Sequence, residues 1–321
     1  MCIWKGVLAM SNVLVTAIGS FSADVVIKNL HKMGHRVIGM DIYPAQWVAN
    51  SMQADVFYQS PYASDTECYV DFVNRICREE NVDYVLPLTD VEVDVLIDHL
   101  PEKGMLCISP KETIEICRDK YKLYQVLRER GIRCLIPTEE FEPENIERYV
   151  FPLVLKPQNG RSSQGLHYVK SERELRFLSE MECLDHYVVQ PKKEGRIVTV
   201  DILRTDDFFM ASPRVELLRT PNGAGTSVQV FSDENIEAAA REIADILGIR
   251  GCVNFEFIKS EKELWFLECN PRFSGGVAFS CMAGYDYISN HMKCFCQIPP
   301  DAAVPVEEKY IARKYSEYIT G

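Results

Sequence analysis

Short apolar runs alternate with amphipathic stretches along the first third of the chain. These apolar runs predict strands over 13–18, 36–40 and 84–88. The stretches between and after them carry apolar residues three and four positions apart, so helices are predicted over 23–33, 71–80 and 91–99. Strands that alternate with helices form a parallel sheet with crossover helices. The pattern therefore predicts an α/β unit at the N-terminus.

The rest of the chain follows a different pattern. One helix is predicted over 112–130, and strand-like runs over 151–157 and 166–169 enclose a polar loop. From residue 187 onward strands dominate, with one helix predicted over 234–247. Strands and helices that are segregated in this way predict an α+β arrangement.

The run 264–270 ends in residues with metal and phosphate chemistry. Glu268 and Asn270 are two positions apart, so on a strand their side chains point to the same face. Carboxylate and amide oxygens are suitable ligands for Mg²⁺ beside nucleotide phosphates. Arg272 follows, and a guanidinium group binds phosphate oxygens in pairs. The segment predicts a metal and phosphate site, although Asn-Pro is also typical of a surface turn.

A second acid lies on the preceding strand-like run, 251–258. Glu256 stands between two phenylalanines, and a carboxylate in such surroundings is costly to bury unless it is paired or binds a metal. The polar residues 259–263 are suitable for a turn between this run and the next. If the two runs form a hairpin, Glu256 and Glu268 can share one cation.

A lysine followed by a polar loop supplies a candidate phosphate site. Lys156 lies near the end of its predicted strand, and the loop 158–165 carries Gly160 and Gly165. Glycines allow backbone N–H groups to approach phosphate oxygens closely. The two glycines have Walker spacing, but leucine and histidine follow where Lys-Ser/Thr is required, so this is not a P-loop.

The order of these motifs resembles that of ATP-grasp enzymes, and the ending around Glu268 most resembles the carbamoyl-phosphate-synthetase-like branch. The resemblance covers about residues 11 to 320. It implies an α/β fold in which an N-terminal parallel α/β (pre-ATP-grasp) domain precedes a two-lobed α+β ATP-grasp fold, with ATP between the lobes. The implied divisions are the N-terminal domain 1–110, the small lobe 111–186 and the large lobe 187–321.

The resemblance also implies roles for individual residues. The positions that match ATP-binding residues are Lys120, Lys156, Gly160, Arg161, Ser162, Ser163, Gly165, Gln190, Pro191, Lys192 and Glu194. The positions that match ligands of Mg²⁺, with Mn²⁺ as an alternative, are Glu256, Glu268 and Asn270. The arginines expected to act near the reacting groups are Arg214, Arg219 and Arg272.

Two positions depart from the family pattern. Gln190 stands where the adenine hinge usually carries an acid, and Ile197 stands near the position of the ribose-binding acid. Glu194 is a candidate substitute for that acid. The departures concern the ribose contact and leave the predicted metal ligands in place, but they also keep open a non-catalytic nucleotide-binding subunit.

A dinucleotide site in the N-terminal unit is a weaker alternative. Asp41 follows the second strand, as in NAD-binding proteins, but the first turn, 19–22, lacks the G-x-G-x-x-G pattern. Polar residues at the strand ends, including Thr89 and Asp90, admit two interpretations: they line a substrate pocket or they cap helices.

Composition and charge exclude several classes of protein. The chain has 321 residues, 47% of them hydrophobic, which suits two or three domains with real cores. A net charge of −12 argues against a nucleic-acid partner, and no apolar run reaches transmembrane length. The 12 cysteines include no CxxC pair and indicate reduced thiols without a zinc site. With no signal-peptide pattern at the start, a cytoplasmic protein is expected.

The activity that the resemblance implies is an ATP-dependent ligation. A small carboxylate, such as an amino acid, would be activated as an acyl phosphate and attacked by an amine, or by a thiol, with ADP and phosphate as products. The expected partners are therefore small molecules, and a homodimer stays open. Two further functions stay open beside the non-catalytic subunit, namely a phosphotransferase and a carboxylase on the same fold.

Overall fold

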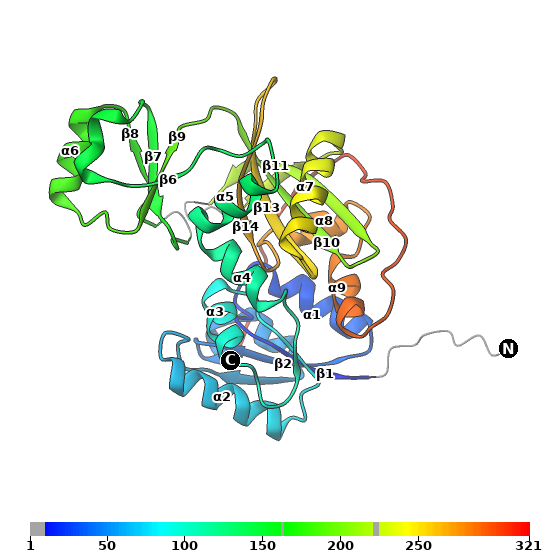
Figure 1. The fold of residues 1–321 in the computed structure, drawn as a ribbon. Coiled ribbons are helices and arrows are strands. Elements are labelled where there is room, and N and C mark those ends of the chain that lie inside the picture. The colour runs from blue at the N-terminus through cyan, green and yellow to red at the C-terminus, as the bar shows by residue number, and fades with distance from the viewer. Residues whose placement is uncertain (1–9, 162–163, 221–224) are drawn as a thin grey trace.

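The strands of the chain form three separate sheets (Figure 1). The computed structural model describes residues 10–161, 164–220 and 225–321, so the predicted phosphate contacts Ser162 and Ser163 lie outside the described residues. A five-stranded sheet lies at the bottom of Figure 1, a four-stranded sheet at the upper left and a six-stranded sheet at the upper right. The first is parallel and the other two are antiparallel.

The N-terminal unit is the predicted parallel α/β domain. Its strand order is β3-β2-β1-β4-β5, with β1 Asn12–Val15, β2 Arg36–Asp41, β3 Val56–Gln59, β4 Tyr84–Leu86 and β5 Met105–Leu106. Its helices are α1 Ala23–Lys32, α2 Thr66–Glu79 and α3 Asp90–Asp98, with short 3-10 turns η1 Ala45–Trp47 and η2 Ala49–Met52. Helix α2 begins earlier than predicted, because the side chain of Asp65 caps it by accepting a hydrogen bond from the backbone N–H of Cys68.

The single helix predicted over 112–130 is wrong, because the chain forms two helices there. They are α4 Lys111–Arg118 and α5 Lys120–Glu129. Asp119 between them has extended backbone angles (φ −99°, ψ 107°), and its side chain accepts hydrogen bonds from the N–H groups of Tyr121 and Lys122. An aspartate that caps a new helix competes with continuation of the old one. The break places Lys120 at the start of a helix.

The four-stranded sheet has the order β6-β9-β7-β8. Its strands are β6 Glu139–Glu140, β7 Leu153–Pro157, β8 His167–Val169 and β9 Tyr187–Pro191. Helix α6 Glu172–Met181 and the 3-10 helix η3 Pro143–Arg148 accompany it, and side chains from these elements form one small core. Because β9 pairs with β7, we propose that the small lobe extends to residue 191 instead of 186.

The six-stranded sheet has the order β14-β13-β10-β11-β12-β15. Its strands are β10 Arg196–Arg204, β11 Phe209–Arg219, β12 Gly225–Val230, β13 Gly251–Lys259, β14 Leu264–Asn270 and β15 Lys309–Ala312. Its helices are α7 Glu234–Leu247, α8 Val277–Met282 and α9 Tyr287–Phe295. Alternate residues of the central strands, such as Val200 and Phe255, pack against α7. The residues between them are left for the opposite face.

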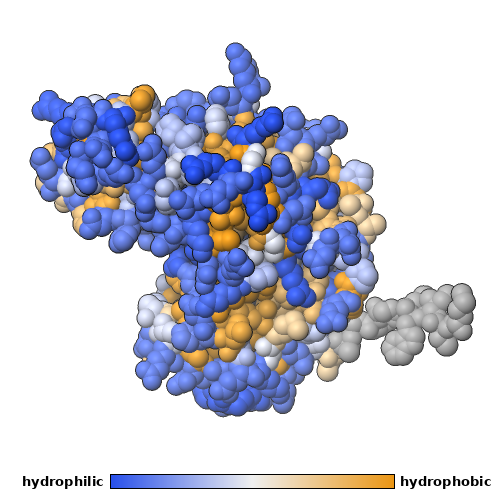
Figure 2. All heavy atoms as spheres, viewed as in Figure 1, coloured by the Kyte–Doolittle hydropathy of each residue, from blue (hydrophilic) through white to orange (hydrophobic). Residues whose placement is uncertain are grey.

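The apolar residues are buried within the units and also between them, since one core cluster joins α1 of the N-terminal domain to β10 and α9. Figure 2 shows a largely hydrophilic face on which hydrophobic residues appear in separate areas. Among the described residues, no helix is both long enough and apolar enough to cross a membrane.

Candidate active site

A cavity of about 1070 Å³ lies between the four-stranded and six-stranded sheets. Its walls come from β7 and β9 on one side and from β10, β11, β13 and β14 on the other, together with the glycine loop and the segment that follows β14. Small-molecule sites are usually about 300–1,000 Å³. The cavity can therefore accommodate a nucleotide together with a second small ligand.

Two rows of polar side chains cross the cavity face of the six-stranded sheet. Residues that are paired across neighbouring strands point to the same face. The first row consists of Arg214 on β11, Thr199 on β10, Glu256 on β13 and Glu268 on β14. The second row consists of Ser212, Asp201, Asn254 and Asn270 on the same four strands. The predicted hairpin of β13 and β14 is confirmed, and it brings the two glutamates directly opposite each other.

The three predicted metal ligands form a compact set of oxygen donors. Glu256 and Glu268 are cross-strand partners, and the amide Nδ2 of Asn270 donates to Glu268 Oε1 at 3.2 Å. Burial, together with the charge of Glu268, raises the pKa of Glu256 to about 7. A divalent cation would relieve this repulsion and would favour the ionised carboxylate. Among the described residues there is no cluster of three His, Cys, Asp or Glu, so the amide would complete the set.

Two lysines face these carboxylates from the other side of the cavity. Burial lowers the pKa of Lys156 on β7 to about 8, although the nearby Glu268 opposes the shift. Burial also lowers the pKa of Lys120, again against the charge of Glu268. The Nζ of Lys120 donates to the backbone oxygen of Gly160 at 2.7 Å, which ties α5 to the start of the glycine loop. A bound anion would raise the pKa of each lysine again, because a nearby negative charge favours the protonated ammonium group. Both lysines are therefore suited to bind an anion.

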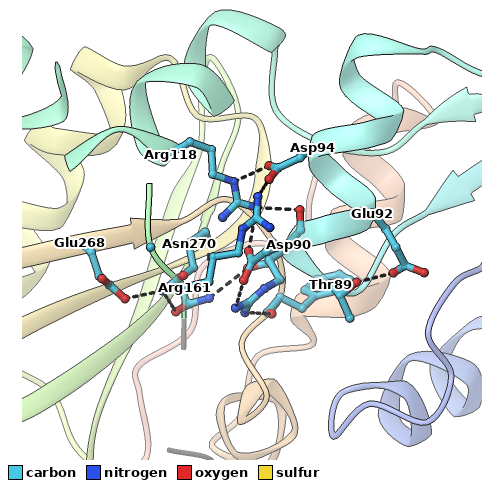
Figure 3. Close-up of polar contacts among 12 residues, drawn as sticks. Thr89, Asp90, Glu92, Asp94, Arg118, Arg161, Glu268 and Asn270 are labelled. Atoms are coloured by element: carbon cyan, nitrogen blue, oxygen red, sulfur yellow. Dashed lines mark hydrogen bonds and ion pairs between the residues drawn. The ribbon is translucent and has the colours of Figure 1, made fainter. Parts of the chain in front are cut away.

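Three arginines from distant segments converge on two aspartates of helix α3 (Figure 3). Arg272 Nη2 donates to Asp90 Oδ2 at 2.7 Å, and Arg118 Nη2 donates to Asp90 Oδ1 at 3.0 Å. Arg118 Nε donates to Asp94 Oδ1 at 2.6 Å, and Arg161 of the glycine loop is ion-paired with Asp94 as well. Although burial opposes it, the charges of Arg272 and Arg118 lower the pKa of Asp90 to about 2. The three guanidinium groups are part of the cavity wall.

Arg214, expected near the reacting phosphoryl group, is held in a buried network. Its Nη1 donates to Asp201 Oδ2 at 2.5 Å and to Ser280 Oγ at 3.0 Å, and its Nη2 donates to Ser274 Oγ at 2.7 Å. A Cβ on Gly276 would lie 2.8 Å from Nη2, so the loop after β14 packs directly on the guanidinium group. Arg214 is 1% exposed, and its charge is neutralised by Asp201. Its contacts therefore stabilise the loop after β14.

Two other predicted residues, Arg219 and Gln190, also belong to the cavity wall. Arg219 is ion-paired with Glu216 and is one-third exposed. Gln190 points its amide away from solvent, where Nε2 donates to Thr138 Oγ1 at 2.8 Å. Its side chain is thus engaged inside the four-stranded sheet.

Ile197 and Glu194, the two positions considered for the ribose contact, both belong to the cavity lining. Ile197 is part of the wall, as expected from the sequence. Glu194, the candidate substitute, is ion-paired with Lys192 at 2.7 Å, and its side chain is 82% exposed. Pro191 also belongs to the wall, whereas Gly165, with φ +68°, lies against Tyr187 and Pro157 outside the lining.

Sequence reasoning missed two residues of this region and misassigned a third. Asn254 lies two positions before Glu256, so the strand period could have identified it. Thr199 had no signal, because only the pairing of β10 with β13 places it beside Glu256. Asp90 was expected to line a pocket or to cap a helix. It does neither, since Thr89 is the N-cap of α3 and Asp90 binds arginines behind the cavity wall.

Two sequence families match the chain. A family described as "ATP-grasp in the biosynthetic pathway with Ter operon" matches residues 184–318, and one described as "PylC-like, N-terminal domain" matches residues 13–108. The solved structure of an L-amino acid ligase from Bacillus licheniformis superimposes with a TM-score of 0.71, over 88% of this chain and 74% of that one, at 17% identity. The chain therefore contains an ATP-grasp region, which the family model matches over residues 184–318.

A second solved structure and a curated relative are also similar to this chain. The biotin carboxylase domain of the 2-oxoglutarate carboxylase of Hydrogenobacter thermophilus, solved with MgADP, ADP and bicarbonate, gives a TM-score of 0.77 at 16% identity and covers 92% of this chain and 72% of that one. The carbamoyl phosphate synthase large chain of Clostridium beijerinckii is 24% identical over 272 residues, which are 79% of this chain and 25% of that protein. The chain thus spans about a quarter of the length of the curated relatives it matches.

Proposed function

We propose that this ATP-grasp protein is an ATP-dependent ligase that joins a small carboxylate to an amine through an acyl phosphate. The observation that carries the proposal is the opposition of charges across one cavity. Glu256 and Glu268 line the cavity from the six-stranded sheet, Lys156 lines it from β7, and Lys120 and Arg272 are part of the same lining. A magnesium-bound triphosphate has the charge pattern that matches both sides.

The residues of the cavity are suitable for binding both Mg²⁺ and ATP. Glu256, Glu268 and Asn270 would hold Mg²⁺, which when bound supplies charge neutralisation for phosphoryl transfer. Lys156 and Lys120 would bind phosphate oxygens together with Gly160 and the glycine loop. Residues 189–192 would meet the adenine with their backbone, since the side chain of Gln190 is engaged with Thr138.

The chemistry requires two displacements. A carboxylate oxygen of the acceptor attacks the γ-phosphorus, and the bond to ADP breaks. The amine nitrogen then attacks the acyl carbon, phosphate leaves, and the nitrogen loses a proton. Arg272 would stabilise the negative charge on the phosphoryl oxygens, and Arg219 would orient the acceptor carboxylate. Such catalysis consists mainly of positioning and electrostatic stabilisation.

The test is a screen of ADP release against pooled small carboxylates and amines. Once a stimulating carboxylate is found, hydroxylamine should replace the amine and give a hydroxamate, which reports an acyl phosphate. A stable phosphorylated alcohol without hydroxamate would support a phosphotransferase instead. A carboxylase is the second candidate function, and the similarity to the carboxylase domain solved with MgADP and bicarbonate favours it. Bicarbonate-dependent carboxylation of a substrate would support this function.

A further inference from the structure

We propose that Asp90, on helix α3 of the N-terminal domain, is a positioning residue that orients Arg272 and Arg118 in the phosphate site; the inference rests on the proposed function. Among the described residues, no side chain of the N-terminal α/β domain belongs to the cavity lining. The domain nevertheless reaches the site through Asp90, whose two carboxylate oxygens bind one arginine each (Figure 3).

The geometry leaves each arginine with donors for a ligand. Arg272 uses Nη2 for Asp90 and Nη1 for the backbone oxygen of Phe273, at 3.0 Å, and Arg118 uses Nε and Nη2 for α3. A guanidinium group has five N–H donors in a fixed plane. Two such contacts of Arg272 and three of Arg118, one of them to the backbone oxygen of Asp90 at 2.9 Å, therefore determine the direction of the remaining donors. Arg272 is 20% exposed and Asp90 is 12% exposed, so the pair is shielded from solvent.

Helix α3 is itself fixed at the turn that carries Asp90. The N-cap residue Thr89 donates from Oγ1 to Glu92 Oε2 at 2.6 Å, and Thr16 at the end of β1 donates to the same oxygen at 2.6 Å. The hydroxyl of Tyr69 on α2 donates to Glu92 Oε1 at 3.2 Å. Glu92 is 5% exposed. The anchor of the arginines is thus connected to the core of the N-terminal sheet.

Charge and orientation act in opposite directions at Asp90. Its negative charge lowers the positive potential that a triphosphate meets, while its oxygens fix the two guanidinium groups. Asp90→Asn removes the charge and weakens the fixed contacts at nearly constant volume. Nucleotide binding should then be unchanged or tighter, while phosphoryl transfer slows. A residue with a merely structural role would weaken both.

The experiment uses the full chain with Mg²⁺ and, for turnover, the carboxylate and amine identified by the screen for ADP release. Affinity is measured by calorimetry with the non-hydrolysable β,γ-imido analogue of ATP, and turnover is measured as phosphate release from ATP. Asp90→Asn should hold the dissociation constant within about threefold, or lower it, and should slow phosphate release by roughly tenfold or more. Asp98→Asn is the matched control, since Asp98 lies on the same helix in an exposed ion pair with Lys111, and it should change neither value.

A double-mutant cycle with Arg272→Gln shows whether Asp90 acts through that arginine. Without Arg272, the charge of Asp90 is less compensated, so Asp90→Asn should improve analogue affinity more in this background than in the wild type. It should also slow phosphate release further by less than about twofold. Equal effects of Asp90→Asn in both backgrounds would overturn the proposal. A wild type that binds the analogue but releases no phosphate with any of the pooled carboxylates and amines would instead contradict the ligase function, and the affinity cycle would still decide the role of Asp90.

Discussion

The two sides of the cavity are built in different ways. The acidic wall, which we define as Glu256, Glu268, Asn254 and Asn270, comes from one hairpin, in which cross-strand pairing places the four side chains together. The basic wall, defined as Lys120, Lys156, Arg118, Arg161 and Arg272, comes from three distant stretches of the chain, namely 118–120, 156–161 and the segment after β14. Three of its members are held by aspartates of another domain.

The difference indicates which substitutions should abolish metal-dependent turnover and which should change the orientation of bound phosphate. In the acidic wall, like charges face each other, so their repulsion destabilises the ligand-free protein, and a bound cation would relieve it. In the basic wall, most charges already have acidic partners, so their orientation matters as much as their presence. Changes in the acidic wall should therefore affect metal-dependent turnover, and changes around the basic wall should separate binding from turnover.

The largest effect is expected from Glu268→Gln. Loss of one ionised oxygen ligand should reduce ATP turnover by about 100-fold or more, in the range found when a single charge-stabilising group is removed. The melting temperature should not fall, because the substitution removes a like charge opposite Glu256. Turnover is measured as ADP release with Mg²⁺, and stability is measured by calorimetry.

The matched control for this prediction is Glu261→Gln, in the exposed turn of the same hairpin. It should leave turnover within about twofold, since surface charges contribute little. Wild-type turnover in Glu268→Gln would show that the acidic wall does not hold the metal.

The next effect concerns Arg214, which lies in the same row as the acidic wall but has a partner of its own. Arg214→Met should reduce the free energy of unfolding by about 3–5 kcal/mol, because it leaves Asp201 as an uncompensated buried charge. Denaturant titration measures the loss. Ser280→Ala keeps the ion pair and removes the two hydrogen bonds of the Ser280 hydroxyl, one to each partner, and should cost about 2 kcal/mol. A stable Arg214→Met variant that binds nucleotide but is inactive would identify Arg214 as a catalytic group instead.

The pH dependence of kcat/KM should reflect both walls in the free enzyme. Glu256, with a pKa of about 7, must lose its proton to bind a cation, so activity should rise as the pH increases through 7. Lys156, with a pKa of about 8, must keep its proton to bind phosphate, so activity should fall as the pH increases past 8. In Lys156→Arg the alkaline limb should disappear, because arginine stays charged. An alkaline limb that persists in this variant would assign it to another group.

The smallest effect is on the stability of the ligand-free protein. The raised pKa of Glu256 means that the native state binds more protons than the unfolded state, so stability should decrease as the pH rises from about 4.5 to 7. Glu256→Gln should remove this dependence and stabilise the free protein by roughly 1–2 kcal/mol at pH 8. Urea titrations at pH 4.5 and pH 8 test this, and an equal effect at both pH values would contradict it.

The sequence by itself determined the features that depend on short spacings. The period of two on a strand placed Glu268 and Asn270 on one face, the short polar turn predicted the hairpin that adds Glu256, and alternating strands and helices predicted the parallel N-terminal sheet. The same local logic failed at Asp119, where capping divided one predicted helix into two.

Only the tertiary structure decided which charges meet. Arg214 donates a hydrogen bond to Ser280, which is 66 residues away in the sequence, and Arg272 donates one to Asp90, which is 182 residues away. Hydrophobic periodicity specifies which face of each element is buried, but it carries no information on which charged groups at the ends of different elements come into contact. Those contacts follow from how the domains pack, so the acidic wall could be predicted from the sequence, whereas the anchoring of the basic wall could not.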